Sequence, residues 1–236
     1  MLEISDLHSN YGDALVLRGI SLQVPARSVT GLLGRNGMGK TTLIRTVMGL
    51  TPPTVRAGSV RFQGQDITGL APNLIALRGI GLVPQGRRLF ASLTVLEHLE
   101  ICPQRAATGA RTAWTVARAF ELFPRLGERR KHRGNQLSGG ERQMLAIVRA
   151  LMINPELLLM DEPTEGLAPV MVQHVENAVR VLRDEGLSVL LVEQNLKSAL
   201  SLADTVHILE TGTLVYSGQA SQLAQDKAIL QRHLGV

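Results

Sequence analysis

The stretch that decides the fold is residues 29–41, which read Val29-Thr30-Gly31-Leu32-Leu33-Gly34-Arg35-Asn36-Gly37-Met38-Gly39-Lys40-Thr41. Its first five residues are mostly apolar and β-branched, which predicts a short buried strand. Residues 34–41 match the phosphate-loop pattern at every fixed position. Apolar spacing at Leu43, Val47 and Leu50 then predicts a helix from Lys40 to about Gly49. Strand, glycine loop and helix form the opening unit of a parallel α/β sheet.

The glycine loop predicts a nucleotide site. Its glycines allow backbone amides to converge on a phosphate, and the following helix adds its positive end. We expect Lys40 to reach the β- and γ-phosphates and the Thr41 hydroxyl to ligate Mg²⁺. A plain glycine-rich turn is the alternative, and a full match between strand and helix argues against it. The predicted nucleotide contacts are Gly34, Arg35, Asn36, Gly37, Met38, Gly39, Lys40, Thr41 and Thr42.

Further short apolar runs predict more strands of the same sheet, buried on both faces: residues 80–83, 157–160, 189–192 and 206–209. Asp161, Glu193 and Gln194 would lie at carboxyl ends of strands, where open α/β sheets bind ligands. Asp161 can hold the Mg²⁺, and Glu162 is placed to polarise the water that attacks the γ-phosphate. A strand that ends in two carboxylates is by itself common, and the glycine loop is what makes this one functional.

Two regions extend this core. Residues 2–7, 17–24 and 60–62 alternate in part and predict a small N-terminal antiparallel layer. The stretch 92–150 shows helical periodicity and no convincing strand, so we expect an α-helical subdomain inserted into the sheet domain. The fold class is therefore α/β, and the order of phosphate loop, strands and helices resembles that of a P-loop NTPase with a RecA-like mixed sheet. We expect residues 1–236 to form a single domain.

Composition narrows the function only slightly. The chain has 236 residues, 44% of them hydrophobic and 19% charged, as in an ordinary globular protein. Lys and Arg total 25 against 20 for Asp and Glu, a net charge of +5. Such a mild excess suits an anionic ligand or a membrane surface as readily as nucleic acid. Two Tyr, one Trp and four Phe argue against base stacking, and we expect no nucleic-acid partner.

The segment Leu137-Ser138-Gly139-Gly140-Glu141 predicts a second helix N-terminus that could bind a phosphate. Ser138 with Glu141 three residues later is a capping box, so an ordinary helix cap is a strong alternative. A cap needs neither glycine, however, whereas close approach of an anion to bare amides favours both. We therefore expect Ser138, Gly139, Gly140 and Glu141 to contact a nucleotide held mainly by another polypeptide.

The glycine loop, the Ser138 segment and Asp161-Glu162-Pro163-Thr164, in that order, resemble an ATP-binding cassette ATPase over nearly the whole chain. The resemblance implies a head-to-tail dimer, with each ATP between the phosphate loop of one subunit and the Ser138 segment of the other. It also implies that Tyr11 stacks on adenine and that Gln85 contacts Mg²⁺. Without the resemblance, Tyr11 would be a strand residue and Gln85 a turn glutamine.

The chain departs from the usual family pattern at two positions. Gln194 stands where a histidine usually contacts the γ-phosphate, and it can hydrogen-bond but carries no charge. Ala168 replaces the aspartate that usually follows the Pro-Thr segment. Gln194, Lys40 and Glu162 are the expected catalytic residues, and the effect of the two replacements on the hydrolysis rate stays open.

These departures point to a subgroup. The segments 83–90, 166–169 and 192–195 are similar to one of the two ATPase subunits of branched-chain amino acid importers. Glu165 and the Arg35-Asn36 pair are similar to a sister group that imports urea and short amides. A non-transport cassette is the weaker alternative, because long coiled-coil insertions and a second fused cassette are missing from the sequence.

The subgroup implies several partners. They are integral-membrane permease subunits, a soluble solute-binding protein and a second, different ATPase subunit, with a homodimer as the alternative to the heterodimer. Residues 1–6 lack the features of a signal peptide, and no apolar run approaches the ~20 residues needed to cross a bilayer. We therefore expect a peripheral protein at the cytoplasmic face of the bacterial inner membrane.

Overall fold

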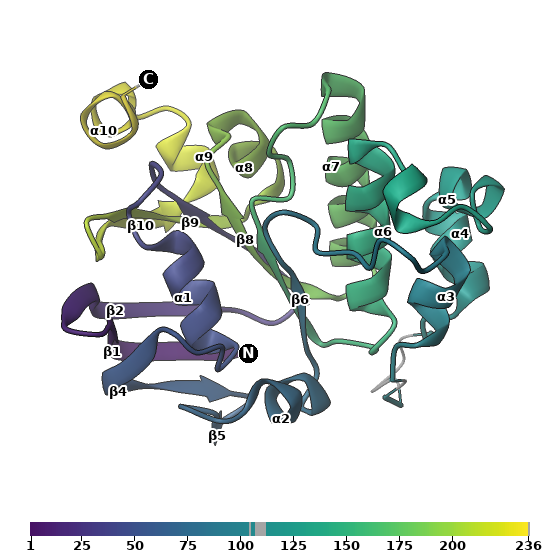
Figure 1. The fold of residues 1–236 in the computed structure, drawn as a ribbon. Coiled ribbons are helices and arrows are strands. Elements are labelled where there is room, and N and C mark those ends of the chain that lie inside the picture. The colour runs from purple at the N-terminus through teal and green to yellow at the C-terminus, as the bar shows by residue number, and fades with distance from the viewer. Residues whose placement is uncertain (104, 107–111, 236) are drawn as a thin grey trace.

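A six-stranded mixed sheet forms the centre of the protein, whose computed structural model describes residues 1–103, 105–106 and 112–235 (Figure 1). Its strand order is β10-β9-β3-β8-β7-β6, and every neighbouring pair is parallel except β9 and β10. All five predicted strands of this sheet are present. The strands are β3 (Val29–Leu33), β6 (Ile80–Val83), β7 (Leu157–Asp161), β8 (Ser188–Glu193), β9 (Thr205–Glu210) and β10 (Thr213–Gln219).

The parallel strands are buried on both faces, as their unbroken apolar runs predict. In β7, Leu157 and Leu159 pack into the cluster that contains helix α1 (Lys40–Val47). Leu158 and Met160 point the other way, into the cluster of α6 (Gly139–Leu151) and α7 (Pro169–Asp184). Because side chains alternate along a strand, one short run supports two cores at once. The sheet thereby separates α1 from α6, the two helices whose starts are predicted to bind phosphate.

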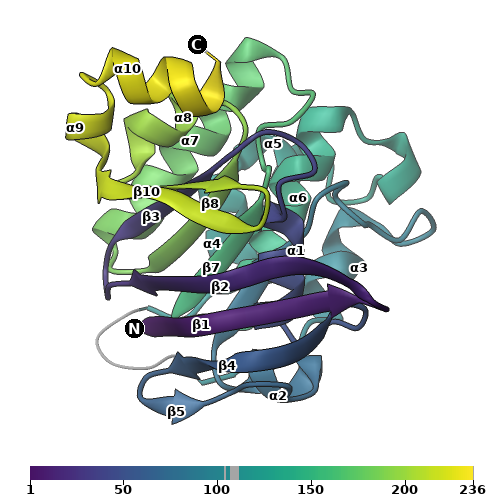
Figure 2. The same ribbon diagram turned by 90° about the vertical axis from the view of Figure 1, so that its left-hand side faces the viewer.

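The predicted antiparallel layer is present as a second sheet that faces the viewer in Figure 2. It has the order β2-β1-β4-β5, and α1 packs between it and the central sheet. A short helix, α2, follows it and packs on β6. These elements are β1 (Leu2–Tyr11), β2 (Ala14–Val24), β4 (Thr54–Phe62), β5 (Gln65–Asp66) and α2 (Pro72–Leu77).

The insertion between β6 and β7 is helical, as expected. Its described elements are α3 (Val95–Glu100), α4 (Val116–Leu122), α5 (Pro124–Glu128), the 3₁₀ turn η1 (Gly134–Gln136) and α6. Residues 104 and 107–111 of the predicted subdomain lie outside the described residues. The limits at 92 and 150, and the single-domain organisation, stay predictions.

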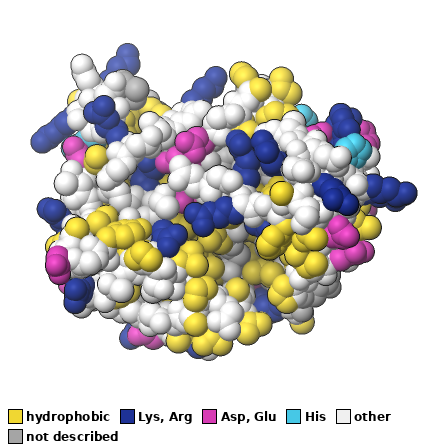
Figure 3. All heavy atoms as spheres, viewed as in Figure 1, with side chains coloured by type: hydrophobic (Ala, Val, Ile, Leu, Met, Phe, Trp, Pro, Cys, Tyr) yellow, Lys and Arg dark blue, Asp and Glu magenta, His cyan; other side chains and the backbone are white. Residues whose placement is uncertain are grey.

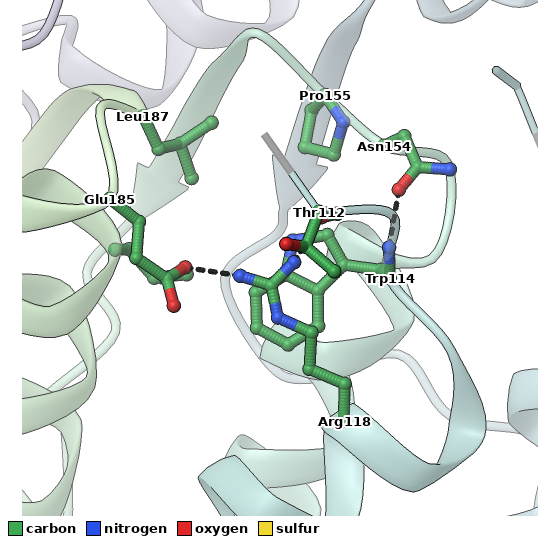
Figure 4. A pocket seen from close by; sticks show the side chains of 8 residues that line it. Thr112, Trp114, Arg118, Asn154, Pro155, Glu185 and Leu187 are labelled. Carbon is green, nitrogen blue, oxygen red and sulfur yellow. Dashed lines mark hydrogen bonds and ion pairs between the residues drawn. The ribbon is translucent and has the colours of Figure 1, made fainter. Parts of the chain in front are cut away.

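One side chain of the insertion ties it to the end of α7 (Figure 4). The Arg118 guanidinium lies 4.1 Å from the centre of the Trp114 ring and forms an ion pair with Glu185. It also donates to the Thr112 carbonyl. Asn154 accepts a hydrogen bond of 2.6 Å from the Trp114 backbone amide. Arg118 thus lines a small surface pocket together with Trp114 and Glu185, and joins α4 to α7.

Helix α8 (Leu196–Leu202) lies between β8 and β9 in the sequence and packs on β3 and β8. The chain ends in the short helix α9 (Ala220–Leu223), which packs on β9 and β10, followed by α10 (Lys227–Ile229) and the last turn η2 (Leu230–Leu234). The turn η2 lies at the upper left in Figure 1, at the yellow end of the chain. Across the described ranges, no helix combines the length and the apolar character that crossing a membrane requires.

Candidate functional site

The glycine loop leaves the carboxyl end of β3 and is fixed to the turn between β9 and β10. A Cβ atom at Gly34 would lie 2.5 Å from the Leu209 carbonyl oxygen, so the backbone approach requires glycine. The Met38 carbonyl accepts a hydrogen bond of 3.1 Å from the Gly212 amide, and its sulfur accepts one of 3.3 Å from the Thr211 amide. These contacts hold the loop at the edge of the sheet, before α1 begins at Lys40.

Lys40 is buried at the centre of the loop. Its ammonium group donates to the carbonyl oxygens of Gly34 at 2.7 Å and Arg35 at 3.1 Å. It also forms an ion pair of 2.9 Å with Glu162 Oε1, and both side chains are about 95% buried, with relative exposures of 4% and 5%. An ion pair this buried is strongly coupled, since removal of either charge leaves the other unpaired in a low dielectric. The structure therefore joins two of the predicted catalytic residues directly.

Thr41 and Asp161 come together on the same side of the sheet. The Thr41 hydroxyl donates to Asp161 Oδ1 at 3.2 Å. Burial raises the pKa of Asp161 to about 6, and the neighbouring Glu162 charge acts in the same direction, against the Thr41 hydrogen bond. A hydroxyl and a buried carboxylate in contact are hard oxygen ligands of the kind that Mg²⁺ prefers. Thr41 and Asp161, two of the three predicted ligands, are thus of a kind that suits a magnesium ion.

Glu162 is held in an unusual backbone conformation. Its φ of 49° lies in the left-handed region, which is uncommon for residues other than glycine and is found at functional sites. Its amide donates to the Val192 carbonyl at 2.9 Å, which pins the residue between β7 and β8. Its Oε2 accepts a hydrogen bond of 3.2 Å from Gln85 Nε2. Gln85 therefore reaches the site from the end of β6.

Two open hollows meet at Glu162. The first has a volume of about 300 Å³ and is lined by Val16, Asn36, Gly37, Gly39, Lys40, Thr41, Thr42, Gln85 and Glu162. The second, of about 390 Å³, contains Glu162, Glu165, Leu167 and Gln194 among its lining residues. Figure 3 shows several Lys and Arg side chains across the middle of this face of the molecule. A hollow with backbone amides and a lysine at its base suits a phosphate chain.

Glu193 organises the far side of the second hollow. Its buried carboxylate accepts hydrogen bonds from the Thr164 hydroxyl at 2.8 Å and from the Thr164 and Asn195 amides at 3.1 and 3.3 Å. Burial outweighs these bonds and raises the pKa of Glu193.

Gln194 follows Glu193 at the surface, where it is exposed. Ala168 is the N-cap of α7 and supplies no side-chain cap, which an aspartate would provide.

The predicted capping box at the start of α6 is present. Ser138 Oγ accepts from the Glu141 amide at 3.2 Å, and Glu141 Oε2 accepts from the Ser138 amide at 2.8 Å. Glu141 Oε1 also pairs with Arg125 at 3.2 Å and Arg129 at 3.6 Å. Burial raises the pKa of Glu141, but the Ser138 hydrogen bonds and the Arg129 charge outweigh it and lower the pKa overall. The carboxylate is thus engaged within its own subunit.

The two glycines of this segment have different reasons to be glycine. A Cβ atom at Gly140 would lie 2.2 Å from Met171 Cε and 2.8 Å from its Cγ, so a side chain there would force Met171 of α7 to move. At Gly139 the nearest atom to such a Cβ would be Arg87 Nη1, at 3.7 Å. Packing against Met171 gives Gly140 a structural reason to be glycine, and the contact of both glycines with an anion stays a prediction. Of the two, Gly139 has no neighbour within this chain that requires the residue to be glycine.

The predicted residues do not all converge. Lys40, Thr41, Gln85, Asp161 and Glu162 meet at the loop, whereas the residues that line its hollow include none from the Ser138 segment. Tyr11 ends β1 and is 37% exposed, outside the lining of either hollow.

Three residues of this region are not among the predicted site residues. Val16, from β2, lines the loop's hollow. Glu165 accepts a hydrogen bond of 2.9 Å from Gln85, and Arg87 donates one of 3.0 Å to the Glu165 carbonyl. A carboxylate three residues after Glu162 was the one available signal for this contact.

Comparison with known proteins agrees with this geometry. The family model described as "ABC transporter" matches residues 17–165, which is more than half of the chain. The chain is 40% identical, over 100% of both chains, to the "High-affinity branched-chain amino acid transport ATP-binding protein BraG" of Pseudomonas aeruginosa. It is 34% identical to the "Lipopolysaccharide export system ATP-binding protein LptB" of Escherichia coli K12, over 99% of this chain and 97% of LptB.

A solved structure gives the same result for the fold and the ligand class. The ADP conformation of MJ1267, an ATP-binding cassette of an ABC transporter, superposes with a TM-score of 0.80 at 28% identity. The alignment covers 98% of this chain and 97% of the other. The phosphate loop, the strand-end carboxylates and the helical insertion all lie within these matches. The chain belongs to the ABC transporter family, as the ATP-hydrolysing cassette of such a transporter.

Proposed function

We propose that this cassette powers an importer of branched-chain amino acids. The observation that carries the proposal is the full-length similarity to the BraG protein, at 40% identity against 34% for LptB. The segments 83–90, 166–169 and 192–195 support the same subgroup, since they include the unusual Ala168 and Gln194.

In this proposal, the loop residues Gly34 to Thr42 bind the phosphates of ATP and Tyr11 stacks on its adenine. Glu162 is the general base for the attacking water, because its carboxylate lies in the hollow with Lys40 and is held by Gln85. Lys40 neutralises phosphate charge, after exchanging its present contacts with Glu162 and the loop carbonyls for the nucleotide. Gln194 hydrogen-bonds the γ-phosphate from the second hollow.

Thr41 and Asp161 hold Mg²⁺ in this proposal, with Gln85 as a third ligand. The fit rests on the buried pair of oxygen ligands in contact with each other. Burial raises the pKa of Asp161 despite the charge of Lys40 nearby, so a bound cation would compensate the buried negative charge of this carboxylate. When bound, the ion neutralises charge that develops on the β- and γ-phosphates. Each of these ligands belongs to this chain.

The proposed working unit is a head-to-tail dimer. Ser138, Gly139 and Gly140, at the start of α6, and Glu141 through the cap, would complete the ATP site of a partner cassette. The positive end of α6 then stabilises γ-phosphate charge across the interface. We propose a heterodimer with a second cassette, at the cytoplasmic face of the bacterial inner membrane. The complex also contains permease subunits and a solute-binding protein.

Uptake by the reconstituted transporter tests the proposal. The cassette would be purified with its membrane subunits and placed in proteoliposomes with ATP on the cassette side. We expect uptake of labelled leucine, isoleucine or valine with the wild-type chain. With Glu162→Gln we expect at least a hundredfold slower hydrolysis, as loss of a general base produces about 10²–10⁴-fold effects. The proposal would be contradicted if unlabelled leucine, isoleucine and valine did not compete with the labelled uptake. Unchanged hydrolysis in the variant would contradict it as well.

Two other cargoes are distinguished in the same vesicles. The 34% identity to LptB favours a test of lipopolysaccharide export, read as lipid extraction from the vesicles. Glu165 with Arg35 and Asn36 favours a test of labelled urea and acetamide. Transport of either, without amino acid uptake, would replace the proposed substrate and leave the ATPase assignment intact.

A further inference from the structure

The amide of Gln85 is held by two carboxylates at once. Its Nε2 donates to Glu162 Oε2 at 3.2 Å and to Glu165 Oε2 at 2.9 Å. An ionised carboxylate only accepts hydrogen bonds, so the amino group of the amide must face both of them. The two N–H bonds of Nε2 are thereby used, and the carbonyl oxygen Oε1 is the end of the amide directed away from the carboxylates.

Glu165 is itself fixed in place by its neighbours. Its amide donates to the Glu162 carbonyl at 3.2 Å, which closes a tight turn between the two glutamates. Its own carbonyl accepts a hydrogen bond of 3.0 Å from Arg87 Nη2. Arg87 lies two residues after Gln85, so the segment that carries Gln85 is bound to the segment after β7 by three hydrogen bonds from two of its residues.

We propose that Glu165 is a positioning residue that selects the orientation of the Gln85 amide. With the amino group held by Glu162 and Glu165, the carbonyl oxygen is presented as a metal ligand. An amide that flipped would instead direct N–H donors at the cation and repel it. The inference rests on the proposed function, since it concerns how Gln85 and Glu162 serve ATP hydrolysis.

Glu162 alone would hold the Gln85 amide in this orientation less firmly than Glu162 and Glu165 together. Its other oxygen is engaged by Lys40 at 2.9 Å, and in the proposed cycle that contact is exchanged for the nucleotide. Glu165 is exposed and makes no such exchange, so its hold on Nε2 persists while Glu162 acts on water. A hydrogen bond to an ionised acceptor is about twice as strong as a neutral one, which favours one amide orientation over the other.

The test compares Glu165→Ala and Glu165→Gln in the reconstituted transporter. For Glu165→Ala we expect kcat to fall about five- to tenfold, with KM for ATP changed less than about twofold, because the loss lies in the active orientation. The Mg²⁺ concentration for half-maximal hydrolysis rises. Glu165→Gln retains an acceptor oxygen and restores most of kcat. The matched control is Glu176→Ala, which removes a carboxylate that pairs with Arg180 on α7. It should leave kcat, KM and the half-maximal Mg²⁺ concentration unchanged.

A binding measurement on the full chain gives a second readout. Fluorescent ATP titrated in EDTA should bind wild type and Glu165→Ala equally. The gain in affinity that Mg²⁺ adds should be smaller in the variant. Unequal binding in EDTA, or an equal gain with Mg²⁺, would overturn the proposal, since a purely structural defect has no preference for the metal complex.

A double-mutant cycle separates this inference from the function on which it rests. If Glu165 acts through Gln85, then Glu165→Ala in a Gln85→Ala background lowers kcat no further. Effects that multiply would overturn the positioning role alone. Wild-type hydrolysis in both Gln85→Ala and Glu162→Gln would instead overturn the proposed site.

Discussion

The charge of Asp161 opposes folding at neutral pH. Its folded-state pKa of about 6 lies above the value of 3.8 for the free side chain, and burial is the main cause. The protonated Asp161 side chain therefore favours the folded state. This contribution to stability is fully present below about pH 4 and is lost as the pH rises through 6. The difference between these pKa values corresponds to about 3 kcal/mol at pH 7.5.

Asp161→Asn should remove this penalty. The amide keeps an oxygen that can accept from Thr41 but carries no charge, so urea unfolding in EDTA without nucleotide should show a variant about 2–3 kcal/mol more stable than wild type at pH 7.5. The gain should shrink to roughly half at pH 5. Equal stability at both pH values would show that the carboxylate is not desolvated in solution.

The two glycines after Ser138 should respond differently to a methyl group. Gly140→Ala should lower the free energy of unfolding by about 1–3 kcal/mol, because its Cβ would overlap Met171. Gly139→Ala should be neutral or slightly stabilising, since alanine favours a helix and the space is open. Thermal unfolding of both variants measures this. Equal losses would contradict the assignment of Gly140 to packing.

Much of the site follows from residue order, and part of it does not. Lys40, Thr41, Asp161 and Glu162 follow or end strands whose carboxyl ends share one edge of the sheet, so their meeting is predictable. The contact between Arg87 and Glu165 is not. This contact depends on the conformation of the loop. Arg87 has a φ of 66°, a backbone geometry that its residue type does not predict.

At the level of elements, the joint between α4 and α7 depends on Arg118. Arg118→Ala should lower the free energy of unfolding by about 1–2 kcal/mol, as it loses a cation–π contact, a carbonyl hydrogen bond and a partly exposed ion pair. Hydrogen exchange should accelerate in α4.

The matched control for this joint is Arg183→Ala. Arg183 pairs only with the adjacent, exposed Asp184 among the contacts described for it, and its loss should change stability by less than about 0.5 kcal/mol. If both variants lost the same stability, the Arg118 contacts would have no particular role in holding the insertion to α7.

The elements themselves were predictable where burial is two-sided. The runs that became β6, β7, β8 and β9 are apolar without interruption, which distinguishes them from loops. Strand β10 was not predicted, because it lies at the sheet edge and alternates between half-buried and exposed residues. The short β5 pairs only two residues with β4, too few for any periodicity to emerge.

At the level of the whole molecule, the central sheet separates two helix starts that each suit a phosphate. The loop before α1 is complete, with lysine, hydroxyl and carboxylates in contact. The start of α6 has a satisfied cap and one glycine, Gly139, with no neighbour that requires it. An account in which the chain supplies complementary halves of two ATP sites explains both features.

The most direct test of this account is ATP hydrolysis by the reconstituted transporter with Gly139→Asp. An acidic residue in the first turn favours the helix, so the melting temperature should be equal or higher and ATP affinity of the isolated chain unchanged. The new charge would meet the partner's γ-phosphate, so we predict a loss of hydrolysis of at least about a hundredfold. Hydrolysis at the wild-type rate by this stably folded variant would contradict the account.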